Sequence, residues 1–331
     1  GFFAPTITVT PTTADAGATV KVNGVDVASG SPSQPIALPG GVPTPIAVVV
    51  RAPNNISEQT YTVVCTRASS ASQEGYIKAS NTDAGDEFGT SISVSGDTLV
   101  VGAPIEASNA TGVNGNQADN SAPTSGAAYV FVRSGSTWTQ QAYLKASNTE
   151  PADRFGTSVA VCGDTLVVGA PGEDSASAGI NGDETSNAAT GSGAAYVFMR
   201  TGTTWAQQAY LKASNTQIDD EFGGSVSCSG STVVVGARSE DSSATGVGGD
   251  QTNNGAGNSG AAYVFARSGA TWSQQAYIKA SNTQINDGFG FLVACDGDTL
   301  AVAAIRESSN ATGVNGDETD NSAPDAGAVY V

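Results

Sequence analysis

The sequence predicts an all-β protein, and two observations support this prediction. Apolar and polar residues alternate in segments such as FGTSVAVCG, which is the period of a half-buried strand, and no segment has a helical period. Glycine and β-branched residues occur throughout the chain, and short turns such as GD separate the strand-like segments. We therefore expect antiparallel sheets that are joined by tight turns and by longer polar loops.

A repeat of 67 residues occurs four times and organises most of the chain. The segment DEFGTSISVSGDTLVVGAP at 86–104 recurs with few changes in each later copy. The repeat positions are Asp86, Asp153, Asp220 and Asp287, and Phe88, Phe155, Phe222 and Phe289. The four copies lie near 85–147, 152–214, 219–281 and 286–331. A fixed period of this kind indicates one supersecondary unit that packs against copies of itself.

Each copy contains four strand-like stretches, whose order predicts a blade of a β-propeller. In the second copy these are FGTSVAVCG, the continuous apolar run TLVVGAP, AAYVFMR and WAQQAYLKAS. A lone four-stranded sheet of this kind exposes two apolar faces, and radial stacking of blades buries both. A copy of the fourth stretch, GYIKAS at 75–80, precedes the repeats, and the last copy stops after its third stretch. Strand 75–80 is therefore expected to complete the last blade and close the ring.

Composition argues against several classes of function. The formal net charge is −18, and so acidic a surface repels nucleic acid and anionic membranes. The chain has no apolar run long enough to span a bilayer and no recognisable signal sequence at its start. It has no histidine, no G-x-S-x-G motif and no phosphate-binding fingerprint. We therefore expect no enzymatic activity, no nucleic-acid partner and no membrane insertion.

The four cysteines are expected to be buried free thiols. Cys65, Cys162, Cys228 and Cys295 form no CxxC pair, which argues against a zinc site or a thioredoxin-type site. Cys228 and Cys295 occupy the same position in consecutive repeats, and equivalent sites in neighbouring units rarely come within disulfide reach. Unpaired cysteine packs as a small apolar residue.

Acidic residues concentrate in loops that the strand order places on one rim of the ring. The loops at 179–187 and 313–321 combine carboxylates, Asn amides and backbone carbonyls, which are ligands that calcium prefers. The predicted calcium ligands are Asp183, Glu184, Asp317, Glu318 and Asp320, together with Glu173 and Glu307 after the second strands. The alternative is that these are solvated loops in which Asp and Asn side chains cap turns.

Three further sets of residues have candidate roles. The Asp86 set is expected to bond the loop backbone or to pair with Lys78, Lys145, Lys212 and Lys279. The tryptophans Trp138, Trp205 and Trp272 open the outermost strands, where they pack between blades or stack on sugars. The sequons that predict candidate N-glycosylation sites begin at Asn55, Asn109 and Asn310.

The phrases FGTSVAV, GDTLVVGAP and GAAYVF resemble FG-GAP repeats, the blade units of integrin α-subunit propellers, and are most similar to the bacterial branch. The resemblance implies a propeller over residues 70–331. Integrin-type propellers have seven blades, so either the ring closes at four here or further repeats lie beyond Val331. Many FG-GAP blades bind calcium through a D-x-D-x-D-G hairpin. That hairpin is only SGDT, CGDT, SGST or DGDT in this chain, so its calcium is not implied here.

Residues 1–69 differ in character from the repeats. Their segments ITVTPTTADAGATVKVNGVDVASG and YTVVCTR resemble the cadherin-like β-sandwich domain of bacterial surface proteins. That domain normally begins with a further pair of strands, which would lie upstream of Gly1. The resemblance therefore implies a sandwich with an open edge, or one that borrows a strand from a partner.

These features favour a non-enzymatic adhesion or binding module, extracellular or at a cell surface, with a protein or carbohydrate partner. A rigid propeller would present its loops to that partner. The alternative is a structural subunit of an extracellular fibre or surface layer, which assembles with copies of itself through strand donation and cation bridges. Calcium is the one cofactor that the sequence indicates.

Overall fold

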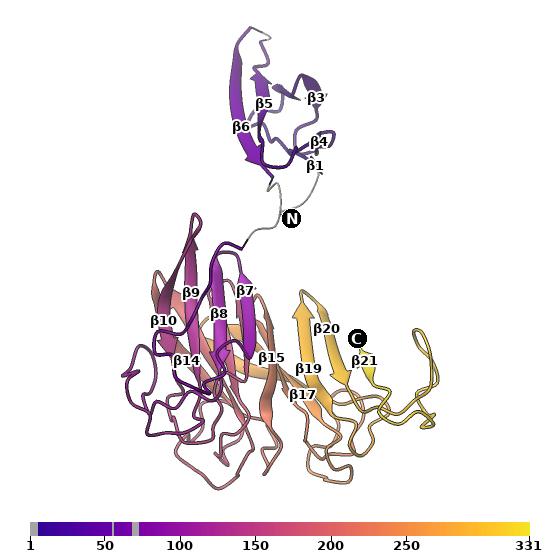
Figure 1. Ribbon diagram of the computed structural model, residues 1–331. Helices are drawn as coiled ribbons and strands as arrows, with labels where there is room; N and C mark the ends of the chain where they lie inside the picture. The colour runs from indigo at the N-terminus through magenta and orange to yellow at the C-terminus, as the bar shows by residue number, and fades with distance from the viewer. Residues whose placement is uncertain (1–5, 55, 68–72) are drawn as a thin grey trace. The chain divides into compact units, whose positions relative to one another are not determined.

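The computed structural model describes residues 6–54, 56–67 and 73–331, which form strands, turns and loops without any helix (Figure 1). The described residues accordingly contain no helix long and apolar enough to cross a bilayer. The chain divides into two compact units, Gly1–Glu74 and Gly75–Val331. The all-β prediction is therefore confirmed for the described residues.

The first unit is a small sandwich of a four-stranded sheet and a short strand pair. The sheet runs in the order β3 (Val25–Val27), β2 (Thr19–Val22), β5 (Pro43–Arg51) and β6 (Glu58–Thr66), and β1 (Thr6–Ile7) pairs with β4 (Ile36–Ala37). Alternate residues of β2 and β5, among them Val20 and Ile46, are buried between the two layers. Strand β6 lies at the edge of its sheet, and its Tyr61 and Val64 are exposed.

The second unit consists of four consecutive antiparallel sheets, which we number in chain order. The first contains β7 (Ser91–Ser95), β8 (Thr98–Ala103), β9 (Ala127–Ser134) and β10 (Thr137–Leu144). The second contains β11 (Ser158–Cys162), β12 (Thr165–Ala170), β13 (Ala194–Thr201) and β14 (Thr204–Leu211). The third contains β15 (Phe222–Ser229), β16 (Thr232–Ala237), β17 (Ala261–Ser268) and β18 (Thr271–Ile278). The fourth has three strands, β19 (Phe289–Asp296), β20 (Thr299–Ala304) and β21 (Ala328–Tyr330).

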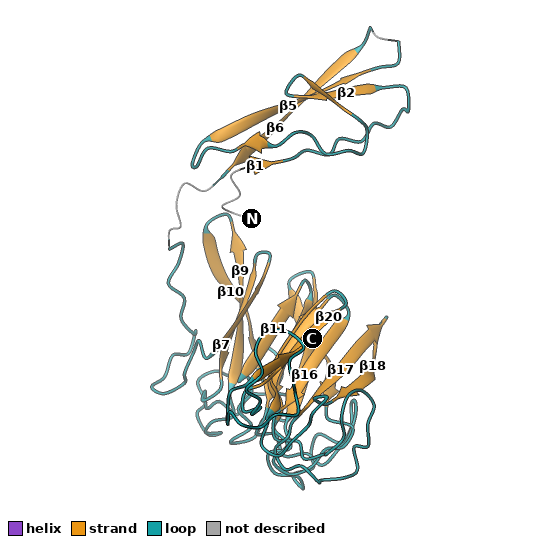
Figure 2. Ribbon diagram, turned by 90° about the vertical axis from the view of Figure 1, so that its right-hand side faces the viewer, coloured by secondary structure: helices purple, strands orange, loops and turns teal. Residues whose placement is uncertain are grey.

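Three of the hydrophobic cores of this unit lie between two consecutive sheets. One core, for example, combines Val130 and Leu144 of the first sheet with Phe155, Tyr196 and Phe198 of the second. The phenylalanine ring packs edge-on against the tyrosine, with ring centroids 5.4 Å apart. A single sheet could not bury both of its apolar faces, so each sheet depends on its neighbours for stability. Figure 2 shows the long loops of this unit gathered at one end of the strands.

The glycines of the repeat allow the backbones of neighbouring sheets to touch. Gly156 of the Phe-Gly pair has a φ of 91°, and a Cβ on it would lie 2.3 Å from the carbonyl oxygen of Ala127. A Cβ on Gly102, in the preceding sheet, would lie 2.0 Å from the carbonyl oxygen of Gly156. Both approaches exclude a side chain. These two glycines are therefore required by one contact between sheets.

The prediction that strand 75–80 completes the last blade is wrong in this structure. Residues 75–79 have no strand assignment, and the fourth sheet consists of three strands. Ile77 and Ala79 instead pack against the first sheet, in a core that includes Tyr129 and Tyr143. Leu144 and Ala146 pack against the second sheet in the same way, but Leu144 also pairs with Ala128 of β9, whereas residues 75–79 are assigned to no strand. The expected closure of the ring within the chain is not formed.

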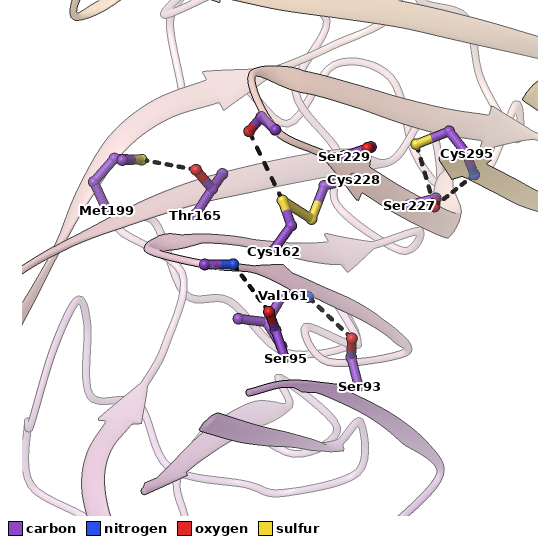
Figure 3. The surroundings of a disulfide bond; sticks show 12 residues. Ser93, Ser95, Val161, Cys162, Thr165, Met199, Ser227, Cys228, Ser229 and Cys295 are labelled. Atoms are coloured by element: carbon purple, nitrogen blue, oxygen red, sulfur yellow. Dashed lines mark hydrogen bonds between the residues drawn. A yellow bond between two sulfur atoms is a disulfide. The ribbon is translucent and has the colours of Figure 1, made fainter. Parts of the chain in front are cut away.

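Serine side chains join the first strands of consecutive sheets (Figure 3). The backbone N–H of Val161 donates to Ser93 Oγ at 3.0 Å, and that of Gly163 donates to Ser95 Oγ at 3.1 Å. The junction between the third and fourth sheets repeats this pattern, in which Cys295 N–H donates to Ser227 Oγ at 3.0 Å. These serines supply acceptors to N–H groups that would otherwise lack partners at the junctions.

A disulfide replaces one of these serine contacts between the second and third sheets (Figure 3). Cys162 stands where Ser95 stands in the first sheet, and it bonds Cys228 with a Cα–Cα distance of 6.0 Å. The expectation of free thiols is therefore wrong for this pair. Equivalent repeat positions are 67 residues apart, whereas these cysteines are 66 apart, so they face each other across the junction. Cys65 and Cys295 are free and half-buried.

We predict that residues copied from the first junction can partly replace this disulfide. Cys162→Ser with Cys228→Val introduces the residue types found at Ser95 and Val161. The free energy of unfolding is expected to be about 2 kcal/mol higher for this double variant than for Cys162→Ala with Cys228→Ala. The reason is that Ser and Val restore a hydrogen bond and apolar contacts. Denaturant unfolding without reductant measures the difference. Equal stabilities of the two variants would contradict this account of the junction.

Candidate functional site

A buried glutamate after the second strand of a sheet joins three segments of the chain. In the second sheet, Glu173 is 1% exposed and accepts hydrogen bonds from Lys212 Nζ at 2.7 Å and Tyr210 OH at 2.7 Å. Glu173 also accepts a hydrogen bond from Asn148 Nδ2 at 3.1 Å. Asn148 follows the outer strand of the preceding sheet. We call this arrangement the glutamate latch. Its copies are Glu106 with Lys145, Tyr143 and Asn81, and Glu240 with Lys279, Tyr277 and Asn215.

The latch is an ion pair within a buried polar network. Lys212 Nζ also donates to Ser192 Oγ at 2.7 Å, and Tyr196 OH donates to Asn148 Oδ1 at 2.6 Å. Burial lowers the pKa of Lys212, and the neighbouring Glu173 carboxylate opposes this shift. Removal of one member would leave its partner charged and buried without a counter-ion. The resulting loss of unfolding free energy is far larger than the contribution of an exposed ion pair. The latch therefore fixes the loops to the sheets and each sheet to its neighbour.

The aspartates of the repeat bond the loop backbone, which is the first of the two alternatives that the sequence left open. Asp153 Oδ2 accepts a hydrogen bond from the backbone N–H of Glu150 at 2.7 Å. Asp86, Asp220 and Asp287 make the same contact three residues upstream. The buried lysines pair with the glutamates instead, as the latch shows.

Burial strongly shifts the protonation of these aspartates. It raises the pKa of Asp153 to about 7, that of Asp220 to about 8 and that of Asp287 to about 6. Backbone hydrogen bonds oppose each shift, and the nearby latch glutamates add to it. The pKa of Asp86 is raised by burial as well. These carboxyls therefore keep their protons to a higher pH than exposed aspartates do.

The aromatic repeat positions pack between sheets. Phe155, Phe222 and Phe289 are buried, whereas Phe88 is half-buried on the first sheet. Trp205 and Trp272 are also buried, and their indole N–H groups donate to Gln141 and Gln208 of the preceding sheet at 2.8 Å. Trp138 is half-buried. The structure thus favours packing over sugar stacking for the two buried tryptophans.

The carboxylates of the predicted calcium loops cap turns. Asp183 accepts hydrogen bonds from the backbone N–H of Thr185 at 2.9 Å and from its hydroxyl at 2.7 Å. Asp317 makes the same pair of contacts with Thr319, and Asp320 makes them with Ser322. Glu184 and Glu318 accept hydrogen bonds from Ser147 and Ser281.

The other two predicted ligands, Glu173 and Glu307, are buried at latch positions. Within the described ranges, no three or more Asp, Glu, Cys or His side chains form a group that could hold a metal ion. Calcium binding by these loops stays a prediction.

The segment GING at 179–182, in the long loop of the second sheet, holds the fourth strand of that sheet. The sequence analysis missed this role. Asn181, with a φ of 53°, donates from its backbone N–H to Tyr210 O at 2.8 Å. Its side-chain oxygen accepts from Tyr210 N–H at 2.9 Å. Gly179 O accepts from Lys212 N–H at 2.7 Å, and Ile180 bridges Leu211. An Asn-Gly pair is a turn signal, so the clamp could have been suspected from the sequence.

The long loops form a polar surface at one end of the sheets (Figure 2). Between the loops of the second and third sheets is a hollow of about 640 Å³, lined by Ala178, 214–217 and 249–252. Its side chains are mostly amides, hydroxyls and one carboxylate, Asp250. This lining combines hydrogen-bonding side chains with a comparable area of apolar surface.

The candidate glycosylation sites are distributed over both units. Asn109 and Asn310 are exposed, each near the start of a long loop. Asn55 lies outside the described residues.

The buried ion pair is expected to dominate the stability of its junction. Lys212→Met leaves Glu173 without its cation and should lower the unfolding free energy by about 3–5 kcal/mol. Adding Glu173→Gln should recover part of that loss, because the remaining groups are neutral. Denaturant unfolding at fixed pH measures both. The matched control is Lys21→Met, which removes an exposed partner of Asp26 and should have little effect. Similar losses at the two lysines would contradict the proposed role of burial.

The raised pKa of Asp220 predicts a loss of stability with increasing pH. The folded state holds this proton up to about pH 8, whereas the unfolded chain releases it near the usual value of 3.8. Its contribution is therefore fully present at low pH and is lost as the pH rises through this window. Asp220→Asn keeps the oxygen that accepts from Gln217 N–H and does not ionise. The variant should gain about 1–3 kcal/mol over the natural chain between pH 5 and pH 8.

Urea unfolding at several pH values tests this expectation. Asp298→Asn, at an exposed hairpin, controls for the removal of one negative charge from an acidic chain. The raised pKa would be ruled out by a constant difference between Asp220→Asn and the natural chain across this range.

Comparison with protein families agrees with this architecture. The FG-GAP repeat family matches residues 71–131, 138–198, 205–265 and 272–331, which together make up more than half of the chain. The cadherin-like beta sandwich domain family matches residues 4–68. A search of curated proteins found no match. On the strength of its four repeats, the chain belongs to the FG-GAP repeat family and carries a cadherin-like β-sandwich domain before them.

Proposed function

We propose that the protein is a non-enzymatic adhesion or binding module that acts outside the cell or at its surface. FG-GAP repeats and cadherin-like domains are generally involved in protein binding and are typical of extracellular proteins. The observation that carries the proposal is the polar loop surface, which the glutamate latches anchor to stiff sheets. Binding residues are commonly placed on loops that a rigid scaffold positions.

We infer that the four sheets are blades of a β-propeller. The sheets bury their faces against one another in chain order, and their first strands adjoin at each junction. Such stacking is how propellers cover both faces of every blade. The ring that this arrangement implies is left open in the structure.

Two features support the extracellular and non-enzymatic parts of the proposal. The Cys162–Cys228 disulfide suits an oxidising environment, where such bonds persist. The aspartates with raised pKa each accept a hydrogen bond from the loop backbone, so they serve the fold in the way expected of structural groups. The partner in this proposal is a protein or a carbohydrate, and calcium is a candidate ligand of the long loops.

The second candidate function is a subunit of an extracellular fibre or surface layer. The observation that favours it is the exposed edge strand β6, with Tyr61 and Val64 in contact with solvent. An exposed edge with apolar side chains is a template for pairing with a strand from another chain. Cation bridges between acidic loops would add to such assembly.

Binding to an array of oligosaccharides and extracellular matrix proteins tests the proposal. We expect saturable binding by the full chain, with affinity about tenfold lower for Asp250→Ala combined with Gln217→Ala, which line the hollow. Asp119→Ala, in the corresponding loop of the first sheet, is the matched control. Absence of binding across the array, together with growth of filaments, would favour the second candidate.

Calorimetric titration with calcium chloride tests the cofactor. If the acidic loops bind calcium, heat is released on titration, and Asp317→Ala with Asp320→Ala removes part of it. Asp15→Ala, in the first unit, controls for the loss of charge. Identical titrations of the natural chain and the loop variant would exclude these aspartates as ligands.

A further inference from the structure

We propose that the junction between the third and fourth sheets binds an acidic sugar unit, one that carries a carboxylate or a sulfate group. The site lies at the end of the strands where the long loops gather. The inference rests on the proposed binding role of the loops, and it specifies a ligand class and a place for it.

A pocket of about 220 Å³ opens between the loops of these two sheets. The third sheet contributes Arg238, which follows β16, and Asn258, which precedes β17. The fourth sheet contributes Asn286 before β19, Phe291 within β19 and Arg306 after β20. Pockets for drug-sized ligands typically enclose about 300–1,000 Å³, so this pocket suits a smaller group such as one sugar unit.

Two cationic side chains line the pocket, in a chain whose net charge is −18. The Arg238 guanidinium pairs with Glu221 and lies 5.7 Å from the centroid of the Phe291 ring. Arg306 is exposed, and no group among the described residues bonds its guanidinium. The pocket therefore carries an excess of positive charge, and a guanidinium fork is well suited to bind a carboxylate or a sulfate.

The unpaired state of Arg306 is explained by its own repeat. Ser239 occupies the position of Arg306 in the third repeat, and its hydroxyl donates to Glu221 at 3.4 Å. The residue of the fourth repeat that corresponds to Glu221 is Gly288. The sequence thus places an arginine at one position and removes the carboxylate that could have paired with it.

The preceding junction shows the opposite charge pattern. The positions of Asn286 and Gly288 are held there by Asp219 and Glu221. Two carboxylates at these positions would repel an anion, whereas an amide and a glycine do not. The pocket between the third and fourth sheets is therefore the one with a charge pattern that favours an anionic ligand over the corresponding place one repeat earlier.

The amides of the pocket favour a sugar over an acidic peptide. Asn258 Nδ2 donates to Asn286 Oδ1 at 3.3 Å. This bond leaves the Nδ2 donor of Asn286 and the Oδ1 acceptor of Asn258 without side-chain partners among the described residues. A sugar hydroxyl both donates and accepts, so it can use both groups, whereas a carboxylate side chain only accepts. The half-buried Phe291 adds an aromatic wall for the C–H face of a sugar ring.

The acidity of the whole chain does not prevent binding of a short ligand. Glu221 is paired with Arg238, and Asp241 accepts a hydrogen bond from the backbone N–H of Asn258 at 2.7 Å, so both carboxylates beside the pocket are engaged. At about 0.15 M salt, exposed charges further away than about 8 Å are largely screened. A short acidic oligosaccharide therefore senses mainly the two arginines, whereas a long polyanion would also meet the acidic surface.

Calorimetric titration of the full chain with a short oligogalacturonate at about 0.15 M salt tests the proposal. We expect Arg306→Gln to raise the dissociation constant about tenfold, because a charge-assisted contact is lost. Gly288→Glu should act similarly, since it supplies Arg306 with the carboxylate found at Glu221. The φ angles at Gly288 and Glu221 are 67° and 56°, so the repeat accepts glutamate in this conformation. Arg154→Gln, which removes an exposed arginine at the first junction, is the matched control.

Three further probes distinguish the sources of the anion. A sulfated oligosaccharide that binds in an Arg306-dependent way supports the proposal as the uronate does. Equal affinity for a neutral oligosaccharide overturns the role of the arginines, and tighter binding of oligoglutamate overturns the sugar in favour of an acidic peptide. The proposal also fails if neither acidic oligosaccharide binds, or if Arg306→Gln binds as the natural chain does. Array binding that persists in such a case leaves the proposed function of the loops in place.

Discussion

The buried pairing of a glutamate with a lysine is the interaction on which the rest of the second unit depends. Glu173 and Lys212 are both shielded from water, and neighbouring groups bond both of them, so the burial of the pair is tolerated. Asn148 comes from the preceding sheet, so one carboxylate fixes a loop, an outer strand and a junction together. The hydrophobic cores supply most of the favourable burial.

Much of the fold could be predicted because the repeat carries it. The 67-residue period and the alternation of apolar residues identify the four sheets and their strands before any coordinates are known. The closure of the ring could not be predicted in the same way. It depends on the rotation between packed faces, and nothing in the alternation of FGTSVAVCG encodes that angle. Residues 75–80 look like a strand by composition, yet the structure assigns them to no strand.

The candidate site was harder to predict than the fold. Sequence position alone does not distinguish the buried Glu173 from the solvated carboxylates of the loops. The Asn-Gly pair at Asn181 suggested a calcium loop, whereas its backbone and side chain hold Tyr210. Equivalent repeat positions do not identify the bond between Cys162 and Cys228, because these neighbours are offset by one residue. In each case the deciding contact lies between segments far apart in the sequence.

The disulfide between the second and third sheets also has a mechanical consequence. Only this junction is covalently bridged among the described residues, whereas the neighbouring junctions have serine hydrogen bonds at the corresponding positions. Under a load that pulls the two ends of the series apart, those neighbours would separate first, and the central pair of sheets would persist as a stapled block. Under such a load the first and fourth sheets would detach while the second and third stay joined, and the detached sheets could pack again on this pair when the load is removed.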